Sequence, residues 1–322
     1  MHIVFLEKIF KNYVRYEAMC LIKKYCLFLF TFYFSRFFVA LHEFKKKYNQ
    51  KMTLNHFTLS IQNKVAHLAI NRPEKANSLH QAAWEELRDA LQYCDKTPDV
   101  HCIVLSGNGD KIFSAGIDLN MLMSTQDLVN DDCEGRKREK FRGFLLDFQD
   151  ILTTSEKISK PILSAIHGGC IGGALDIVCA TDMRYCTADA YFVIKEIDLG
   201  MVADLGTLQR LPKLISDGLT RELAYTGRKL LAHEAKESGL VNRVFETKEQ
   251  MLKEVIDIAE TIATKSPLSI RGTKRNIVFA RDHSVTESLE YMANWNAAMF
   301  YSNDLMEAFK ARMTKEKPEF KD

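Results

Sequence analysis

The sequence lacks several signatures that would assign a function class directly. Its formal net charge is only +2 over 322 residues, which predicts no strong attraction to nucleic acid or to anionic membranes. It contains no P-loop and no GxGxxG fingerprint for a dinucleotide. It also contains no low-complexity segment and no short tandem repeat. These absences leave a globular protein of ordinary composition, long enough for one large domain or two.

The eight cysteines form no CxxC pair and no other metal-ligand pattern, so we expect no metal site. Most of them lie in apolar runs, which predicts buried free thiols in a reducing compartment. The cysteines are Cys20, Cys26, Cys94, Cys102, Cys133, Cys170, Cys179 and Cys186.

Residues 1–52 differ in composition from the rest of the chain. An aromatic, apolar stretch at residues 25–35 is followed by the basic cluster 45–47, and it is too short to predict a transmembrane span. Three interpretations stay open: a signal peptide or membrane anchor, an organelle-targeting presequence, and a gene-model artefact upstream of a true start at Met52. A membrane partner is expected only if this segment belongs to the natural protein.

The remaining sequence alternates between patterns of strands and helices. Alternation over residues 57–72 predicts a hairpin, and helical spacing follows at residues 80–94. Residues 124–142 are polar, after which residues 141–159 predict a long amphipathic helix. The C-terminal third is mostly helical. Short strands are predicted at residues 101–107, 161–166, 182–187, 191–194 and 240–246. This order predicts the α/β class.

A glycine-rich segment, HGGCIGGALD at residues 167–176, predicts a tight turn between a strand and a helix. The unpaired N–H groups at a helix start can hold a developing negative charge, although such glycines also serve simply to pack a helix on a strand. A second glycine-containing turn, KIFSAGIDLNML from residue 111, offers the N–H of Ile117. Two such donors from separate turns would form an oxyanion hole.

Three carboxylates follow these turns: Asp176, Glu196 and Asp204. Each has a structural interpretation of its own, since Asp176 suits the first turn of a helix and Asp204 suits a helix N-cap. Glu196 follows the end of a predicted strand. Carboxylates that converge on one pocket raise one another's pKa, which makes them usable as acids and bases near neutral pH.

Four segments, NRPEKANSL, SAGIDL, HGGCIGGALD and KEIDLGMVAD, together resemble the enoyl-CoA hydratase/isomerase (crotonase) superfamily. Within it the resemblance is to the dienoyl-CoA isomerases, and it extends from Met52 to the C-terminus. It implies a crotonase-type spiral of repeated ββα units over residues 53–260. It also implies a helical C-terminal trimerisation region over residues 261–322, in a homo-oligomer that is a trimer or a hexamer.

The resemblance implies isomerisation of 3,5-dienoyl-CoA to 2,4-dienoyl-CoA in unsaturated fatty acid β-oxidation. The N–H groups of Ile117 and Gly173 would hold the thioester oxygen, Glu196 would remove a proton from C2, and Asp204 would protonate C6. Asp176 would support Glu196. No cofactor is expected, because the acyl-CoA is the substrate. Residues expected along the coenzyme A are Ala76, Ala115 and Gly116.

Two alternatives remain. A 2-enoyl-CoA hydratase of this family would use Asp176 and Glu196, but such hydratases have no acid at the position of Asp204, so Asp204 favours the isomerase. A non-catalytic RNA-binding or scaffold relative would use the basic cluster Arg136, Lys137, Arg138, Lys140 and Arg142. We expect a mitochondrial or cytosolic location, and a peroxisomal one less, because the chain ends in KPEFKD and not in Ser-Lys-Leu.

Overall fold

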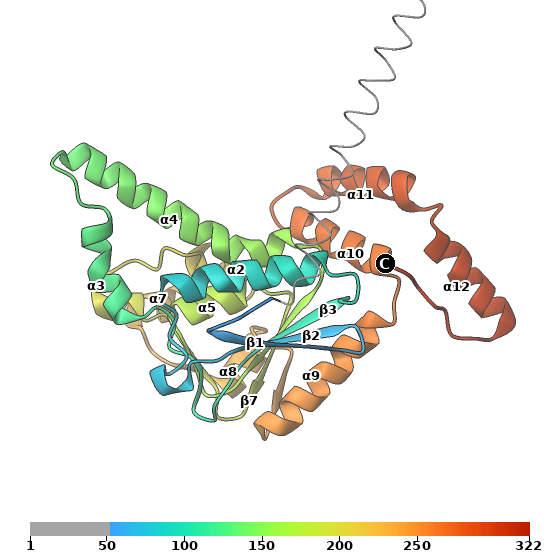
Figure 1. Ribbon diagram of the computed structural model, residues 1–322, viewed down its shortest axis with the longest axis horizontal. Helices are drawn as coiled ribbons and strands as arrows, with labels where there is room; N and C mark the ends of the chain where they lie inside the picture. The colour runs from blue at the N-terminus through green and yellow to red at the C-terminus, as the bar shows by residue number, and fades with distance from the viewer. Residues whose placement is uncertain (1–51) are drawn as a thin grey trace, which may run out of the picture. The chain divides into compact units, whose positions relative to one another are not determined.

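The strands of the protein divide between two sheets. The computed structural model describes residues 52–322 and leaves out the side chains of residues 126 and 128 (Figure 1). The larger sheet has the strand order β1-β2-β3-β5-β7-β10, with bounds Phe57–Gln62, Val65–Ile70, Cys102–Gly107, Ile162–Ile166, Met183–Thr187 and Arg243–Phe245. The smaller sheet has the order β4-β6-β8-β9, with bounds Ile112–Ser114, Gly169–Ile171, Tyr191–Val193 and Leu230–Leu231.

Consecutive strands alternate between these sheets. β3, β5 and β7 pair in parallel in the larger sheet, whereas their successors β4, β6 and β8 pair in parallel in the smaller one. Helical turns follow each strand pair, so the chain winds as a spiral of ββα units. The predicted α/β class and crotonase-type spiral are therefore confirmed, and the hairpin predicted at residues 57–72 is the antiparallel pair β1 and β2.

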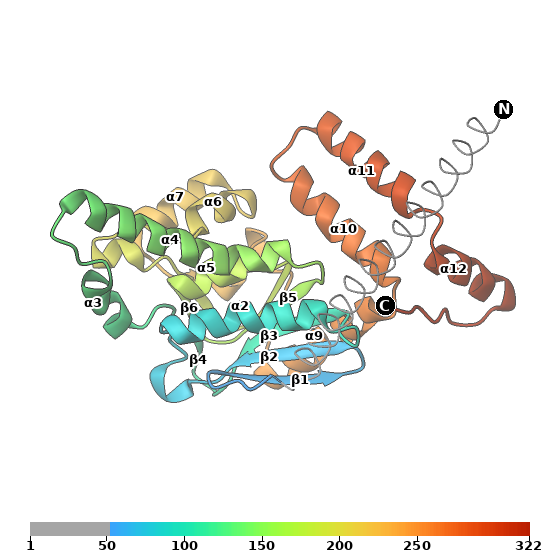
Figure 2. The ribbon, with the colours of Figure 1, turned by 45° about the horizontal axis from the view of Figure 1, so that its top comes forward.

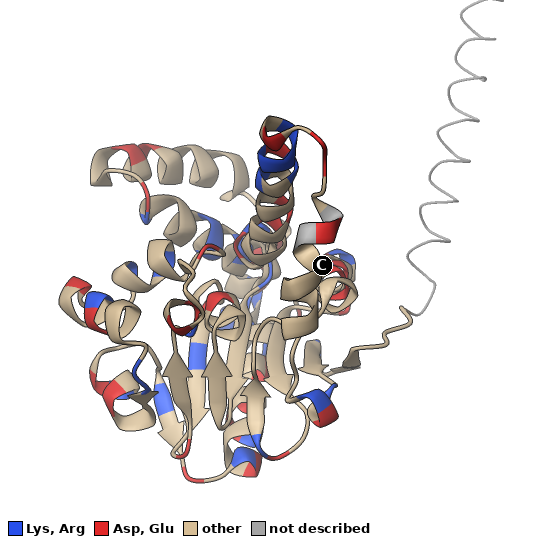
Figure 3. Cartoon of the chain, turned by 90° about the vertical axis from the view of Figure 1, so that its left-hand side faces the viewer, with Lys and Arg blue, Asp and Glu red and all other residues tan. Residues whose placement is uncertain are grey.

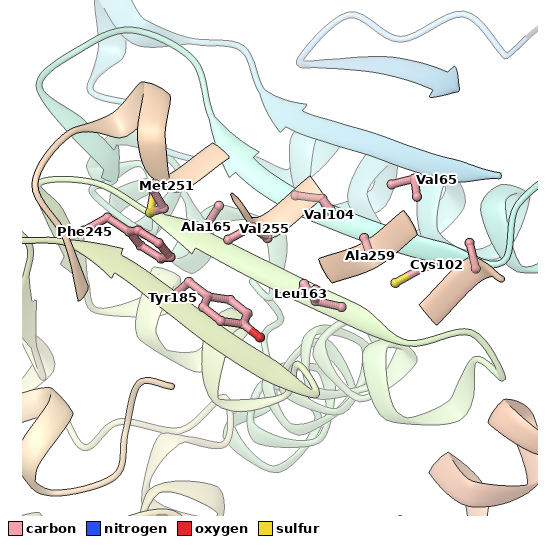
Figure 4. Packing of buried hydrophobic residues seen from close by; sticks show 11 residues of the cluster. Val65, Cys102, Val104, Leu163, Ala165, Tyr185, Phe245, Met251, Val255 and Ala259 are labelled. Carbon is pink, nitrogen blue, oxygen red and sulfur yellow. The ribbon is translucent and has the colours of Figure 1, made fainter. Parts of the chain in front are cut away.

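Helices cover both faces of the larger sheet. α9 packs on one face, where its residues Met251, Val255, Ala259 and Ala263, each four positions apart, meet the strands (Figure 4). Burying a side chain such as Val255 or Met251 contributes roughly 1.5–3 kcal/mol. α2 and α4 lie together on the other side of the sheet from α9 (Figures 1 and 2).

The described helices have the following bounds. The α-helices are α2 Gln81–Lys96, α3 Leu119–Leu128, α4 Glu134–Lys157, α5 Gly173–Cys179, α6 Thr207–Arg210, α7 Asp217–Thr226, α8 Ala232–Glu237, α9 Lys248–Ala263, α10 Pro267–Ala280, α11 Val285–Met299 and α12 Asn303–Thr314. The 3-10 turns are η1 Pro73–Lys75, η2 Glu196–Leu199 and η3 Leu211–Lys213.

Two local predictions need correction. α4 begins at Glu134, earlier than the amphipathic pattern at residues 141–159 indicates. Its first turns are polar and exposed, so they show no apolar face from which a helix could be predicted. The glycine segment at residues 167–176 contains the strand β6, which has no alternation of its own and is defined by pairing with β4 and β8.

Residues 53–322 form one compact unit, in which α10, α11 and α12 lie away from the two sheets (Figure 2). None of the helices in residues 52–322 is long and apolar enough to cross a membrane. The six cysteines in this range are free thiols, and all except Cys133 are buried, as predicted. Cys20, Cys26 and the interpretations of the N-terminal extension lie outside the described residues.

Candidate active site

The two glycine-containing turns are in direct contact. They follow β4 and β6, which are neighbours in the smaller sheet, so both chains leave the sheet at the same edge. Gly116 has a φ of 79°, and a Cβ built on it would lie 2.4 Å from the carbonyl oxygen of Ile171 and 2.8 Å from the nitrogen of Gly173. Only glycine permits this approach.

The contact brings together two free backbone donors. The N–H groups of Ile117 and Gly173 have no hydrogen-bond acceptor within residues 52–322, although the N–H of Asp118 donates to Leu79 at 3.0 Å. A Cβ built on Gly173 would lie 3.5 Å from the nitrogen of Ile117, and both residues line a cavity of about 430 Å³. Two adjacent donors facing a cavity can bind an oxygen that becomes negatively charged.

Two buried side chains support this pair of turns, and sequence reasoning did not single them out. The Trp84 ring packs against Gly173: a Cβ built on Gly173 would lie 3.1 Å from Cζ2 of Trp84. The Asn77 side chain donates to the carbonyl oxygens of Asn108 at 2.8 Å and Phe113 at 3.1 Å. The available signals were the helical spacing around Trp84 and the position of Asn77 within NRPEKANSL.

Glu196 and Asp204 line the same cavity as the two donors. Glu196 begins η2, shortly after β8 ends, and its Oε1 would lie 3.1 Å from a Cβ built on Gly172. Burial raises the pKa of both carboxyl groups, and the charge of Asp204 raises the pKa of Glu196 further. A base and an acid can therefore face one bound molecule.

Asp176 lies behind the cavity and is not among its lining residues. Its side chain is only 1% exposed, and its Oδ1 accepts a hydrogen bond from the N–H of Thr207 at 2.6 Å. Burial, followed by the charge of Glu196, raises the pKa of Asp176 to about 7. The N-cap of α6 is Gly206, and the carboxylate that accepts from the first N–H of this helix is that of Asp176, so the N-cap interpretation of Asp204 is wrong.

The residues expected along coenzyme A differ in their placement. Ala115 lines the cavity, and its N–H donates to the carbonyl oxygen of Ala76 at 2.9 Å. Ala76 and Gly116 are not among the lining residues, and Gly116 instead packs against the second turn. Lys75 and Lys195, which sequence reasoning did not select, also line the cavity and add positive charge near it.

The basic cluster on α4 is largely paired with acids. Arg136 and Lys140 form ion pairs with Asp131 at 2.9 Å each, and Lys137 and Arg138 approach Glu134 at 4.0 and 3.9 Å. Figure 3 shows both signs of charge at this end of the helix. This pairing weakens the case for a polyanion site. Residues 52–322 also contain no group of three or more His, Cys, Asp or Glu side chains that could hold a metal ion.

A family model described as enoyl-CoA hydratase/isomerase matches residues 60–322. The chain belongs to this family. Within the enoyl-CoA hydratase/isomerase family, it is 46% identical over 257 residues to the mitochondrial Delta(3,5)-Delta(2,4)-dienoyl-CoA isomerase of Mus musculus, covering 80% of this chain and 78% of that protein. It is 47% identical to the peroxisomal Delta(3,5)-Delta(2,4)-dienoyl-CoA isomerase of Arabidopsis thaliana, covering 80% of this chain and 92% of that protein.

A solved member of the enoyl-CoA hydratase/isomerase family has the same fold. The enoyl-CoA hydratase of Bacillus anthracis superposes with a TM-score of 0.74 at 28% identity, covering 83% of this chain and 99% of that chain. The fold alone therefore does not distinguish a hydratase from an isomerase, and the reaction has to be inferred from the side chains that line the cavity.

Proposed function

We propose that this protein isomerises 3,5-dienoyl-CoA to 2,4-dienoyl-CoA in the β-oxidation of unsaturated fatty acids. The observation that carries the proposal is the cavity that Asp204 shares with Glu196 and with the donors Ile117 and Gly173. A hydratase needs two carboxylates at one water, whereas transfer of a proton along a diene needs a base and an acid at separate carbons. The relatives from mouse and Arabidopsis thaliana are both named dienoyl-CoA isomerases, which supports the same reaction.

The proposed reaction moves two double bonds and one proton. The Glu196 carboxylate removes a proton from C2, and the electron pair of that C–H bond forms the C2=C3 bond. The C3=C4 electrons move to C4=C5, and the C5=C6 electrons take the proton of the Asp204 carboxylic acid at C6. During transfer the N–H groups of Ile117 and Gly173 stabilise the negative charge on the thioester oxygen. A raised pKa suits Asp204 to this role because it favours the protonated form.

Asp176 acts on this reaction from outside the cavity. Its hydrogen bond to the N–H of Thr207 fixes the backbone three residues after Asp204, so it positions the acid. The charge of Glu196 in turn helps to raise the pKa of Asp176. We assign Asp176 a positioning role, with Glu196 as the base and Asp204 as the acid.

The test is an assay of the purified full chain with 3,5-dienoyl-CoA, followed by the appearance of 2,4-dienoyl thioester absorbance, and separately with 2-enoyl-CoA, followed by the loss of enoyl thioester absorbance. We expect isomerisation of the dienoyl substrate. Asp204→Asn should lower kcat by about 10²–10⁴-fold, the usual contribution of a general acid. Asp198→Asn is the matched control, because Asp198 is exposed, pairs with Lys195 and does not line the cavity. Turnover of 2-enoyl-CoA alone would overturn the proposal in favour of a hydratase.

We further propose a homo-oligomer, a trimer or hexamer, whose contacts include the C-terminal helices. α11, α12 and the link between them expose large apolar side chains, namely Leu289, Phe300, Tyr301, Met306 and Phe309. Light scattering of the purified chain measures its mass, and a monomer at micromolar concentration would contradict this expectation. We propose a mitochondrial location, because the relative from mouse is named mitochondrial, whereas the relative from Arabidopsis thaliana is named peroxisomal.

A further inference from the structure

Asp204 and its neighbour Leu205 are lining residues of two cavities, and we call this pair the shared wall. They line the cavity of about 430 Å³ that holds Glu196, and they also line a second cavity of about 360 Å³. The second cavity lies among α4, α6 and the end of α10, and its other lining residues include Gln149, Thr153 and Gln209. Glu196 lines only the first cavity, whereas Asp204 lines both.

The second cavity is polar and reaches the protein surface. Gln209 and Lys213 are exposed lining residues, so water can enter. Glu156 is bound by Arg210 at 2.8 Å and by Arg281. Burial raises the pKa of Glu156, but the hydrogen bonds from these two arginines outweigh it and lower that pKa. Glu156 therefore stays ionised and does not compete as a proton donor.

Two side chains of the second cavity hold the shared wall in place. Gln149 donates its Nε2 proton to the carbonyl oxygen of Asp204 at 2.8 Å, and Arg210 donates from Nη1 to the carbonyl oxygen of Leu205 at 3.4 Å. A Cβ built on Gly206 would lie 1.8 Å from Arg210 Nη1, so the guanidinium lies directly against the loop. The backbone around Asp204 is thus fixed by side chains that line the second cavity.

The proposed reaction changes the protonation state of both carboxyl groups. Each turnover transfers one proton to Glu196 and takes one from Asp204, so both groups must exchange a proton before the next turnover. We propose that Asp204 regains its proton from water in the second cavity, and that this cavity is a dedicated proton inlet for the acid. The inference rests on the proposed function. The inlet lets Asp204 recover without passing a proton through the cavity that the acyl chain occupies.

Two variants narrow the inlet from opposite walls: Thr153→Leu on α4 and Gln209→Phe on α6. Gln209→Ser is the matched control, because it keeps the second cavity open and polar. The substrate is 3,5-dienoyl-CoA with both C2 hydrogens replaced by deuterium, in ordinary water. Mass spectrometry and proton NMR of the product give the isotope at C6, and steady-state and single-turnover rates are measured beside it.

We expect the wild type and Gln209→Ser to place solvent hydrogen at C6. In Thr153→Leu and Gln209→Phe, kcat should fall by about tenfold, because return of a proton to Asp204 becomes slower. The single-turnover rate should stay unchanged, because one turnover does not require Asp204 to regain a proton, and this rate also shows that each variant is folded. Deuterium from C2 should then appear at C6, since Glu196 becomes the nearest proton source.

Two results would overturn the inlet. One is transfer of the C2 deuterium to C6 by the wild type, which would mean direct return from Glu196 to Asp204. The other is a wild-type kcat and a wild-type isotope pattern in both narrowed variants. Neither result affects the proposed function, whose failure is a separate observation: no turnover of 3,5-dienoyl-CoA by the wild type.

Discussion

Replacing Gly116 by alanine tests whether contact between the two glycine turns aligns the oxyanion donors. At a φ of 79°, alanine costs about 1–2 kcal/mol of stability from backbone strain alone. The new Cβ would also lie 2.4 Å from the Ile171 oxygen and 2.8 Å from the Gly173 nitrogen, so one turn has to move. Because Ile117 and Gly173 flank this contact, we expect kcat to fall about 10²–10³-fold, the effect of removing one oxyanion donor.

Gly239→Ala is the matched control for Gly116→Ala. Gly239 has a φ of 87°, but a Cβ built there meets its nearest atom, the oxygen of Leu214, at an ordinary 3.7 Å. The strain cost should again be about 1–2 kcal/mol, with kcat unchanged. Urea unfolding measures stability, and the 3,5-dienoyl-CoA assay measures kcat. A wild-type kcat in Gly116→Ala, or an equal loss of kcat in Gly239→Ala, would refute the reasoning.

Three further predictions concern the support of the site. The pKa of Asp176 rises from 3.8 to about 7 on folding, so the folded state holds a proton that the unfolded state releases between these values. The free energy of unfolding should fall as pH rises through that window, by up to ~1.4 kcal/mol per pH unit. Asp176→Asn should remove this pH dependence in urea titrations, and the same pH dependence in wild type and variant would contradict the prediction. Trp84→Ala should cost about 3–5 kcal/mol, because the ring is fully buried under Gly173, and a loss below 1 kcal/mol by denaturation would show that the ring is dispensable. Asn77→Asp removes a buried donor to two carbonyl oxygens and should lower the free energy of unfolding by at least ~1–3 kcal/mol. An unchanged free energy of unfolding in the same denaturation measurement would contradict this prediction.

Much of the fold could be predicted from the sequence, because its elements carry their own periodicity. The helix α2 buries one face at helical spacing, and β3 is a continuous apolar run that is buried along its whole length. Both patterns can be recognised in the order of the residues. β6 could not be predicted in this way, since it is three residues long and is defined by its neighbours β4 and β8.

The site was predictable only in part. The donors and carboxylates were located through the resemblance of their segments to a family, and spacing alone left a structural interpretation open for Asp176 and Asp204. The bond from Thr207 to Asp176, the Trp84 ring under Gly173 and the second cavity all join segments that are far apart in the chain. No local pattern encodes such contacts, so they required the folded structure.

The pairing of β4 with β6 also has a consequence for the chain as it is being made. Ile117 leaves the ribosome well before Gly173, Glu196 and Asp204, so the two donors and the two carboxylates meet only after strands distant in sequence have paired. Until then each carboxyl group is in water and has an ordinary proton affinity. A partly folded chain would therefore be inert toward CoA thioesters, and chemical competence would arise together with the last steps of tertiary assembly.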